Sequence, residues 1–344
     1  MKMTPVVILF GSSAVLLAVI FGNIMLPAAI WQPKPSASAV PYSKLELEGR
    51  QLYVQNGCVY CHSQDTRPMD WDIGSGDAAE PGDYAYDSPH LVGSERNGPD
   101  LFREGGYHTD DWHWAHFEDP RFTRPQSFMP SFKYIKGQQR RALIAYIQCL
   151  GGRTSRERAA EQDRLQVKMI AYYGKGVAEN VAYLNSTMPK QWLTMPNPEP
   201  ITAGSIDRGH TLYLAYCAGC HGPAGDGRGQ AKPYLDPPPM DFTLLQASGA
   251  SPSTTFNGKS NHVSPLNNGI IYYAVLNGIP GSAMPAFKGQ LESEKIWDVG
   301  NYVGVAFMGW KTQGEHGEYQ EISELGRPGD PRLFAKTLGS PQAM

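Results

Sequence analysis

The chain has 344 residues, of which 41% are hydrophobic and 18% charged, and a net charge of −3. This length allows two domains of ordinary size plus connecting segments. The near-neutral charge argues against nucleic acid as a partner.

The first predicted element is an apolar helix from Pro5 to Ile30, which contains no charged side chain. At about 1.5 Å per residue it can cross the ~30 Å hydrocarbon core of a bilayer. A cleaved secretory signal is the alternative, because Ala37-Ser38-Ala39 resembles a cleavage site. The apolar run is longer than a usual signal core, so we expect a single-pass anchor with the rest of the chain translocated.

Composition then divides the chain after the anchor. Between the two globular bodies we expect a charged helix followed by a Pro-rich break, with the helix packed on one of them. The predicted parts are an anchor 1–31, a tether 32–43, a first body 44–153, a connector 154–202, a second body 203–312 and an irregular tail 313–344.

The two bodies repeat one plan. Each opens with a short helix, continues with Cys-x-x-Cys-His, a loop-rich middle and a Met-Pro pair, and closes with a helix that has a central Tyr. From His62 to Met129 is 67 positions, and from His221 to Met284 is 63. Several landmarks at matched offsets indicate a duplicated domain.

The chemistry is carried by CVYCH in the first body and CAGCH in the second. In c-type cytochromes the two thiols of this motif form thioethers to the haem vinyl groups, and the adjacent His becomes the proximal iron ligand. We therefore predict two covalently bound haem c groups, one on Cys58, Cys61 and His62, the other on Cys217, Cys220 and His221.

Two other uses of Cys-x-x-Cys must be weighed. A structural zinc site made by both pairs fits the cysteine count, but it does not explain why His follows each pair. A thioredoxin-type dithiol would follow a strand within a βαβ pattern, and the sequence contains no such strand signal.

Methionine is the predicted sixth ligand of each iron. Met129 precedes Pro130 and Met284 precedes Pro285, at matched distances after each haem motif. Ligation by His and Met raises the reduction potential relative to ligation by two His. With both axial positions filled, neither iron would have an open position for substrate, which favours electron transfer over catalysis.

A proline carbonyl is expected to orient each proximal imidazole by accepting its Nδ1–H. Pro99 is the candidate for His62, and Pro237 or Pro238 is the candidate for His221. Simple turn formation is the alternative role for these prolines.

Two helix-approach sites follow from the repeat. Gly49 and Gly209 lie in the opening helices, where the missing side chain would let the closing helix approach near Tyr146 and Tyr302. Cys149, in the closing helix of the first body, is expected to pack as a small hydrophobe.

Weaker signals lie in the middle of the first body. His113 and His116 could bind metal, although packing or a partner contact is favoured. Between Asp65 and Asp119 there are fourteen Asp or Glu against three Arg. This stretch is either a solvated loop region or a surface that attracts a cationic partner.

The first body resembles a known family. GRQLYVQNGCVYCHSQDTRP, SPHLVGSERNGPDL, DDWHWAHFEDPR and SFMPSF are similar to the membrane-anchored monohaem subunit (FixO or CcoO) of cbb3-type (C-type) haem-copper oxidases, over about 1–152. The second body, with GDGRG, PPP-x-DF and GIPGSAMPAF, resembles a broader group of class I cytochrome c domains. The resemblance carries the haem ligands over to the residues named above.

The resemblance implies a mainly α fold, with one N-terminal transmembrane helix followed by two class I cytochrome c domains. It implies a periplasmic electron carrier on a bacterial inner membrane, without an active site of its own. Electrons would pass from a periplasmic donor through the second haem and then the first to a membrane-embedded haem-copper oxidase subunit. A nitric oxide reductase partner, a free-standing tethered shuttle and a dihaem enzyme remain alternatives.

Overall fold

The computed structural model describes residues 4–30, 34–64, 79–93, 96–248, 268–310, 312–313 and 319–320. This part of the chain is mainly helical, as predicted, and its strands are the short antiparallel pair β1 (Thr312–Gln313) and β2 (Tyr319–Gln320). Nearly all of the predicted tail lies outside the described residues.

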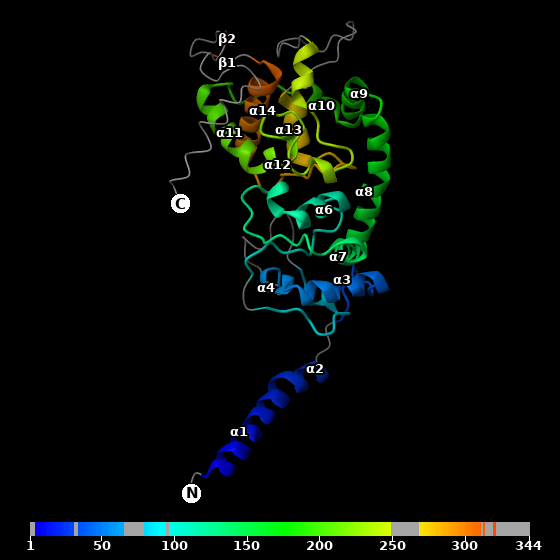
Figure 1. Cartoon of the computed structure of the whole chain (residues 1–344), viewed down its shortest axis with the longest axis vertical. Helices are drawn as coiled ribbons and strands as arrows, with labels where there is room; N and C mark the ends of the chain where they lie inside the picture. The colour runs from blue at the N-terminus through cyan, green and yellow to red at the C-terminus, as the bar shows by residue number, and fades with distance from the viewer. Residues whose placement is uncertain are drawn as a thin grey trace.

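The helices form three groups that follow one another along the chain (Figure 1). The anchor contains α1 (Pro5–Ile20), the π-helix η1 (Phe21–Met25) and α2 (Leu26–Ile30). The first body contains α3 (Lys44–Gln55), α4 (Cys58–Cys61), η2 (Pro81–Tyr84), α6 (Asp110–Glu118), η3 (Pro120–Phe122) and α7 (Gly137–Cys149). Then come α8 (Gly152–Tyr173), α9 (Val177–Thr187), α10 (Lys190–Leu193), α11 (Ala203–Tyr216), α12 (Ala218–His221), η4 (Lys232–Tyr234), η5 (Phe242–Ser248), α13 (Asn268–Asn277) and α14 (Ser293–Met308).

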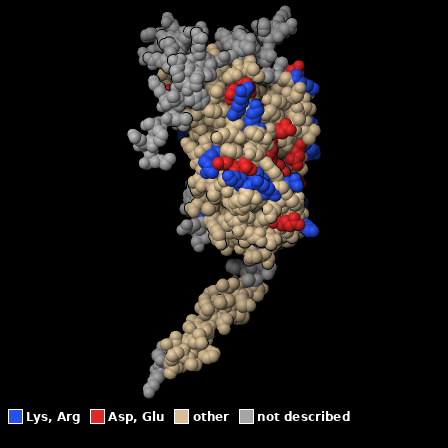
Figure 2. Space-filling model, viewed as in Figure 1, with Lys and Arg blue, Asp and Glu red and all other residues tan. Residues whose placement is uncertain are grey.

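The anchor is a free-standing apolar helix. Among the described residues, Pro5–Met25 is the one helix long and apolar enough to cross a membrane, with a mean hydropathy of 2.4. No residue of α1 is buried against the rest of the chain, and Figure 2 shows no charged side chain on its described part. Its surface is therefore suited to lipid.

The first body is built on the crossing of α3 and α7. Ser43 caps α3, because its Oγ accepts from the Glu46 amide at 3.3 Å and the Glu46 carboxylate accepts from the Ser43 amide at 2.6 Å. A Cβ on Gly49 would lie 2.7 Å from Tyr146 Cβ and would collide with the Ala142 carbonyl. Glycine therefore permits this close helix crossing.

The second body repeats that crossing with α11 and α14. Thr202 caps α11 by accepting from the Ser205 amide at 3.2 Å. A Cβ on Gly209 would lie 2.8 Å from Tyr302 Cβ and would collide with the Asp298 carbonyl. The predicted role of Gly49 and Gly209 is confirmed at both crossings.

Helix α8 braces both bodies, and our expectation that it packs on only one of them is wrong. Gln162 accepts from the Gly281 amide of the second body at 2.6 Å and donates to the Gly106 carbonyl of the first at 3.3 Å. One turn later, Gln166 donates to Asp111 at 3.1 Å and to the Asp236 carbonyl. Figure 1 shows α8 running along the side of both bodies.

Part of the acidic stretch is paired inside the first body, whereas Glu80 and Asp110 are exposed. Three carboxylates pair with arginines in the first body, as Asp87–Arg50, Asp100–Arg96 and Glu118–Arg140, and Glu104 is hydrogen-bonded to His108. Asp65 and several of its acidic neighbours lie outside the described residues. On the face drawn in Figure 2, positive and negative side chains are interspersed. Neither expectation for this stretch holds for these paired carboxylates.

Candidate cofactor-binding sites

The first cavity brings together every site residue predicted for the first body. It is lined by the predicted set Cys58, Cys61, His62, Pro99 and Met129. The Tyr53 hydroxyl donates to the His62 carbonyl, and His62 Nδ1 donates to the Pro99 carbonyl at 2.9 Å. A Cβ on Gly98 would lie 2.6 Å from His62 Nδ1. The loop therefore fixes the imidazole through its backbone and leaves Nε2 free to bind iron.

The second cavity is lined by Cys217, Cys220, His221 and Met284. Tyr213, the counterpart of Tyr53, donates from its hydroxyl to the Gly222 carbonyl at 2.6 Å. The expectation of Pro237 or Pro238 as the imidazole partner is wrong. His221 Nδ1 is 3.2 Å from the Met240 carbonyl, just beyond the proline run.

The two methionines sit in matching turns. The amide of Met129 donates to Ser127 Oγ at 3.2 Å, and the amide of Met284 donates to Ser282 Oγ at the same distance. A serine two residues earlier thus holds each backbone turn. Each methionine lines the same cavity as its Cys-x-x-Cys-His motif.

The donor set fits haem c. Burial lowers the pKa of His62 and His221, which keeps each imidazole in the neutral form that binds metal. Burial also raises the pKa of Cys58 to about 11 and those of Cys217 and Cys220 to about 12. A redox dithiol instead needs a lowered thiol pKa. A bound haem supplies a one-electron iron couple.

The alternative metal chemistry gains no support from the described residues. The two Cys pairs line different cavities, and no cluster of three or more His, Cys, Asp or Glu side chains there could hold a metal ion. His113 is buried, as the packed interpretation expects. Cys149 is buried too, with its Sγ 3.0 Å from the Tyr146 carbonyl.

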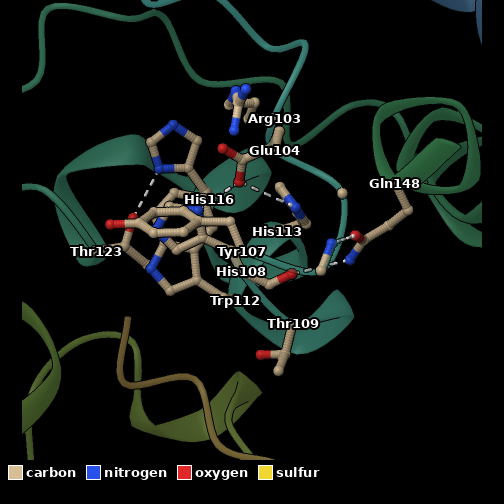
Figure 3. A network of polar contacts seen from close by, with 12 residues as sticks. Arg103, Glu104, Tyr107, His108, Thr109, Trp112, His113, His116, Thr123 and Gln148 are labelled. Carbon is tan, nitrogen blue, oxygen red and sulfur yellow. Dashed lines mark hydrogen bonds and ion pairs between the residues drawn. The ribbon is translucent and has the colours of Figure 1, made fainter. Parts of the chain in front are cut away.

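Sequence reasoning named His113 and His116 but missed that they form a polar wall of the first cavity with Glu104 and His108. Glu104, His108, His113 and His116 line it, and Figure 3 shows Glu104 among these histidines. Burial raises the pKa of Glu104 and lowers that of His108 well below its ordinary value. The one sequence signal for this contact is the spacing of Glu104 and His108, four positions apart.

Sequence reasoning also missed that the two cavities share part of their lining. Trp112, Arg124 and Tyr216 line both of them. The Arg124 guanidinium lies 5.8 Å from the centre of the Tyr216 ring and donates to Gln290 Oε1 at 3.0 Å. Each cavity is therefore completed by side chains of the other body.

Comparison with known proteins agrees with this geometry. Residues 3–148 match the family model described as cytochrome c oxidase, mono-heme subunit/FixO, and residues 204–303 match that of cytochrome c oxidase, cbb3-type, subunit III. Two separate parts of the chain thus each match a cytochrome c family of cbb3-type oxidases. No curated protein matches the sequence.

These two family matches have direct consequences. The chain has an electron-transfer role tied to cytochrome c oxidase, binds haem c covalently, is anchored to the membrane and associates with a haem-copper oxidase catalytic subunit. A chain in the solved structure of the Kuenenia stuttgartiensis reducing HAO-like protein complex is 17% identical in sequence to this chain. The match covers 74% of this chain and 94% of that chain, with a TM-score of 0.25. That likeness is too weak to bear on function.

Proposed function

We propose that this cbb3-type cytochrome c holds two haems and relays electrons from the second body to the first and then to the oxidase catalytic subunit. Cys58, Cys61, His62 and Met129 hold one haem, and Cys217, Cys220, His221 and Met284 hold the other. Methionine closes each iron, so the chain has no substrate site of its own. Both bodies lie on the periplasmic side.

The shared wall is the observation that carries this proposal. Trp112, Arg124 and Tyr216 each line both cavities, so one layer of side chains separates the two sites. Trp112 is 6% exposed and packs in one apolar cluster with Ala231 and Cys220 of the second body. Contact of this kind supports direct transfer between the bodies rather than independent reactions with a partner.

The two haem motifs face different surroundings, which supports the order of transfer. In the second motif, a Cβ on Gly219 would lie 3.0 Å from the Phe122 carbonyl carbon of the first body. In the first motif, the side chain of Tyr60 is among the exposed aromatics, with 78% of the residue accessible. The second attachment loop thus faces the first body, whereas the first loop faces outward, where a partner can approach.

The anchor supports the same order. The first body follows the anchor and, in Figure 1, lies between it and the second body. A membrane-embedded acceptor is therefore nearer the first site. The second body extends away from the anchor, toward a periplasmic donor.

The order can be tested with Met129→His and Met284→His in the complex purified in mild detergent. Ligation by two His lowers the potential of the altered site. Rapid-mixing absorbance with a reduced donor should show that Met284→His slows electron entry. Met129→His should leave entry intact, hold the electron in the second site and suppress oxygen reduction. The reverse pattern would contradict the order.

The same preparation separates the alternative partners. Oxygen reduction by the copurified complex supports the oxidase. Nitric oxide reduction without oxygen reduction would assign the chain to a nitric oxide reductase, and isolation without a polytopic haem protein would support the tethered shuttle.

A further inference from the structure

The polar wall of the first cavity contains a buried imidazole with one nitrogen unpaired. His108 is 5% exposed and lines the cavity. Its Nδ1 is hydrogen-bonded to Glu104 Oε1, whereas its Nε2 is buried and has no hydrogen-bond partner. A buried polar atom without a partner costs free energy, so such an atom at a cavity wall indicates a ligand group.

The imidazole is held rigidly in this position. Its ring stacks on Trp112 with centroids 3.5 Å apart and planes inclined by 17°. Its backbone carbonyl accepts from Gln148 Nε2 at 3.0 Å. The ring orientation is therefore fixed before any ligand binds.

The unpaired Nε2 of His108 is a donor when Nδ1 accepts a hydrogen bond instead of donating one. In that arrangement the Glu104 carboxyl carries a proton and donates it to Nδ1. Burial raises the pKa of Glu104 and lowers that of His108, so it shifts both groups toward this neutral pair.

The ligand group that fits this arrangement is an acceptor, and the surrounding charge favours an anion. Arg103 and Arg124 line the same cavity. The haem expected there carries two propionate carboxylates, and a carboxylate is the natural acceptor for an imidazole N–H close to guanidinium groups.

We propose that His108 Nε2 donates a hydrogen bond to a propionate of the haem in the first cavity, with Glu104 as the residue that positions the donor. This inference rests on the proposed function, because it needs a haem in that cavity. The second cavity lacks an equivalent group: apart from His221, no described residue that lines it is His, Asp or Glu.

The test uses the full chain with both haems attached and with ¹³C in the haem propionate carboxylates. Redox-difference infrared spectra identify the propionate band, and a redox titration gives both potentials. His108→Leu removes the donor. His108→Asn retains an amide near Glu104 but is too short to reach the cavity, whereas His108→Gln retains a donor near the position of Nε2.

Loss of the donor leaves the propionate charge less compensated, which stabilises ferric iron. We expect His108→Leu and His108→Asn to shift the labelled band and to lower the first potential, by about 59 mV if the electron affinity falls tenfold. His108→Gln should restore both values. Glu104→Gln should change neither, because its amide can still donate to Nδ1. The potential of the second haem should stay constant throughout.

The matched control is His210→Leu, which removes a half-buried imidazole that stacks on Tyr302 in the second body. It should leave the first potential and the labelled band unchanged. An unmoved band in both His108→Leu and His108→Asn, or a change confined to water bands, would overturn the inference. So would a Glu104→Gln shift as large as that of His108→Leu. A chain without covalent haem would instead refute the proposed function.

Discussion

The two bodies share a framework but differ in the cavities that it encloses. In each, a glycine lets the opening and closing helices cross, a tyrosine holds the carbonyl of the haem-motif loop, and a serine turn carries the methionine. The first cavity adds Glu104 and three buried or half-buried histidines, whereas the second is lined mainly by apolar side chains.

This difference separates the residues expected to bind haem from the residues expected to tune its reduction potential. The framework supplies the same set of candidate ligands twice, so it fits one haem in each body. The polar wall is present once, so any property that differs between the sites should be traced to it. We therefore expect mutations at the two helix crossings to change stability by similar amounts. Mutations in the two cavity walls should have different effects.

The largest expected effect tests the shared framework. Gly49→Ala and Gly209→Ala each force a Cβ against a backbone carbonyl of the partner helix. Each should destabilise its own body by about 3 kcal/mol. Hydrogen exchange measured by mass spectrometry reports the two bodies separately, through peptides of α7 and α14.

Gly300→Ala is the control for these variants, because its Cβ would meet Ile271 Cγ2 at an ordinary 3.6 Å. Removing a helical glycine there should stabilise the second body by about 0.5–1 kcal/mol. If Gly49→Ala and Gly209→Ala leave α7 and α14 equally protected, the helix crossings do not determine the framework.

The next effect sharpens the contrast between the cavities. Burial lowers the pKa of His113 to about 4, from an ordinary value of 6.5. Between these pH values the unfolded chain binds more protons than the folded first body, so stability falls as the pH drops from 6.5 to 4. The raised pKa of Glu104 acts in the opposite sense above pH 4.5 and offsets part of this loss.

We expect the free energy of unfolding of the first body to fall by on the order of 2 kcal/mol as the pH drops through this range. The second body should lose less, because its His210 is only half-buried. The measurement is protection of α7 and α14 at several pH values, corrected for intrinsic exchange. His113→Gln should make the α7 profile less steep, and the remaining slope belongs to His108 and His116, whose pKa values burial also lowers. An unchanged profile would contradict the role of His113.

The smallest effect concerns the brace between the bodies. Gln162→Ala and Gln166→Ala each remove hydrogen bonds to both bodies, at about 1 kcal/mol per bond. Solution scattering and exchange in α8 should reveal looser docking in the double variant. Glu161→Ala breaks only the exposed pair with Arg164 and should have little effect. If the Gln162→Ala/Gln166→Ala double variant and Glu161→Ala gave the same scattering and exchange, α8 would not hold the bodies together.

The sequence was informative wherever a local pattern repeats. Matched spacing predicted the paired bodies, the glycine crossings and the Cys, His and Met residues that line each cavity. Pro99 was predicted from its place in Gly98-Pro99-Asp100-Leu101, after the first haem motif, and its carbonyl is indeed the partner of His62 Nδ1. The anchor followed from an uncharged apolar run that needs no tertiary information.

The remainder depends on tertiary contacts that spacing does not encode. The partner of His221 is Met240 because the backbone turns beyond the proline run, and composition alone cannot give that register. Glu104 and His108 were hidden in a stretch interpreted as acidic surface. Gly219 at the boundary and Gln290 beside Arg124 act between bodies, so neither has a signal within its own repeat.

The central claim is that each cavity holds one covalent haem through its own pair of cysteines. The most direct measurement is the mass of the denatured chain together with its haem content after alkaline pyridine treatment. We predict two haems per chain, and one after either Cys58→Ala/Cys61→Ala or Cys217→Ala/Cys220→Ala. A mass equal to that of the bare polypeptide, or a single haem in the unaltered chain, would contradict the account.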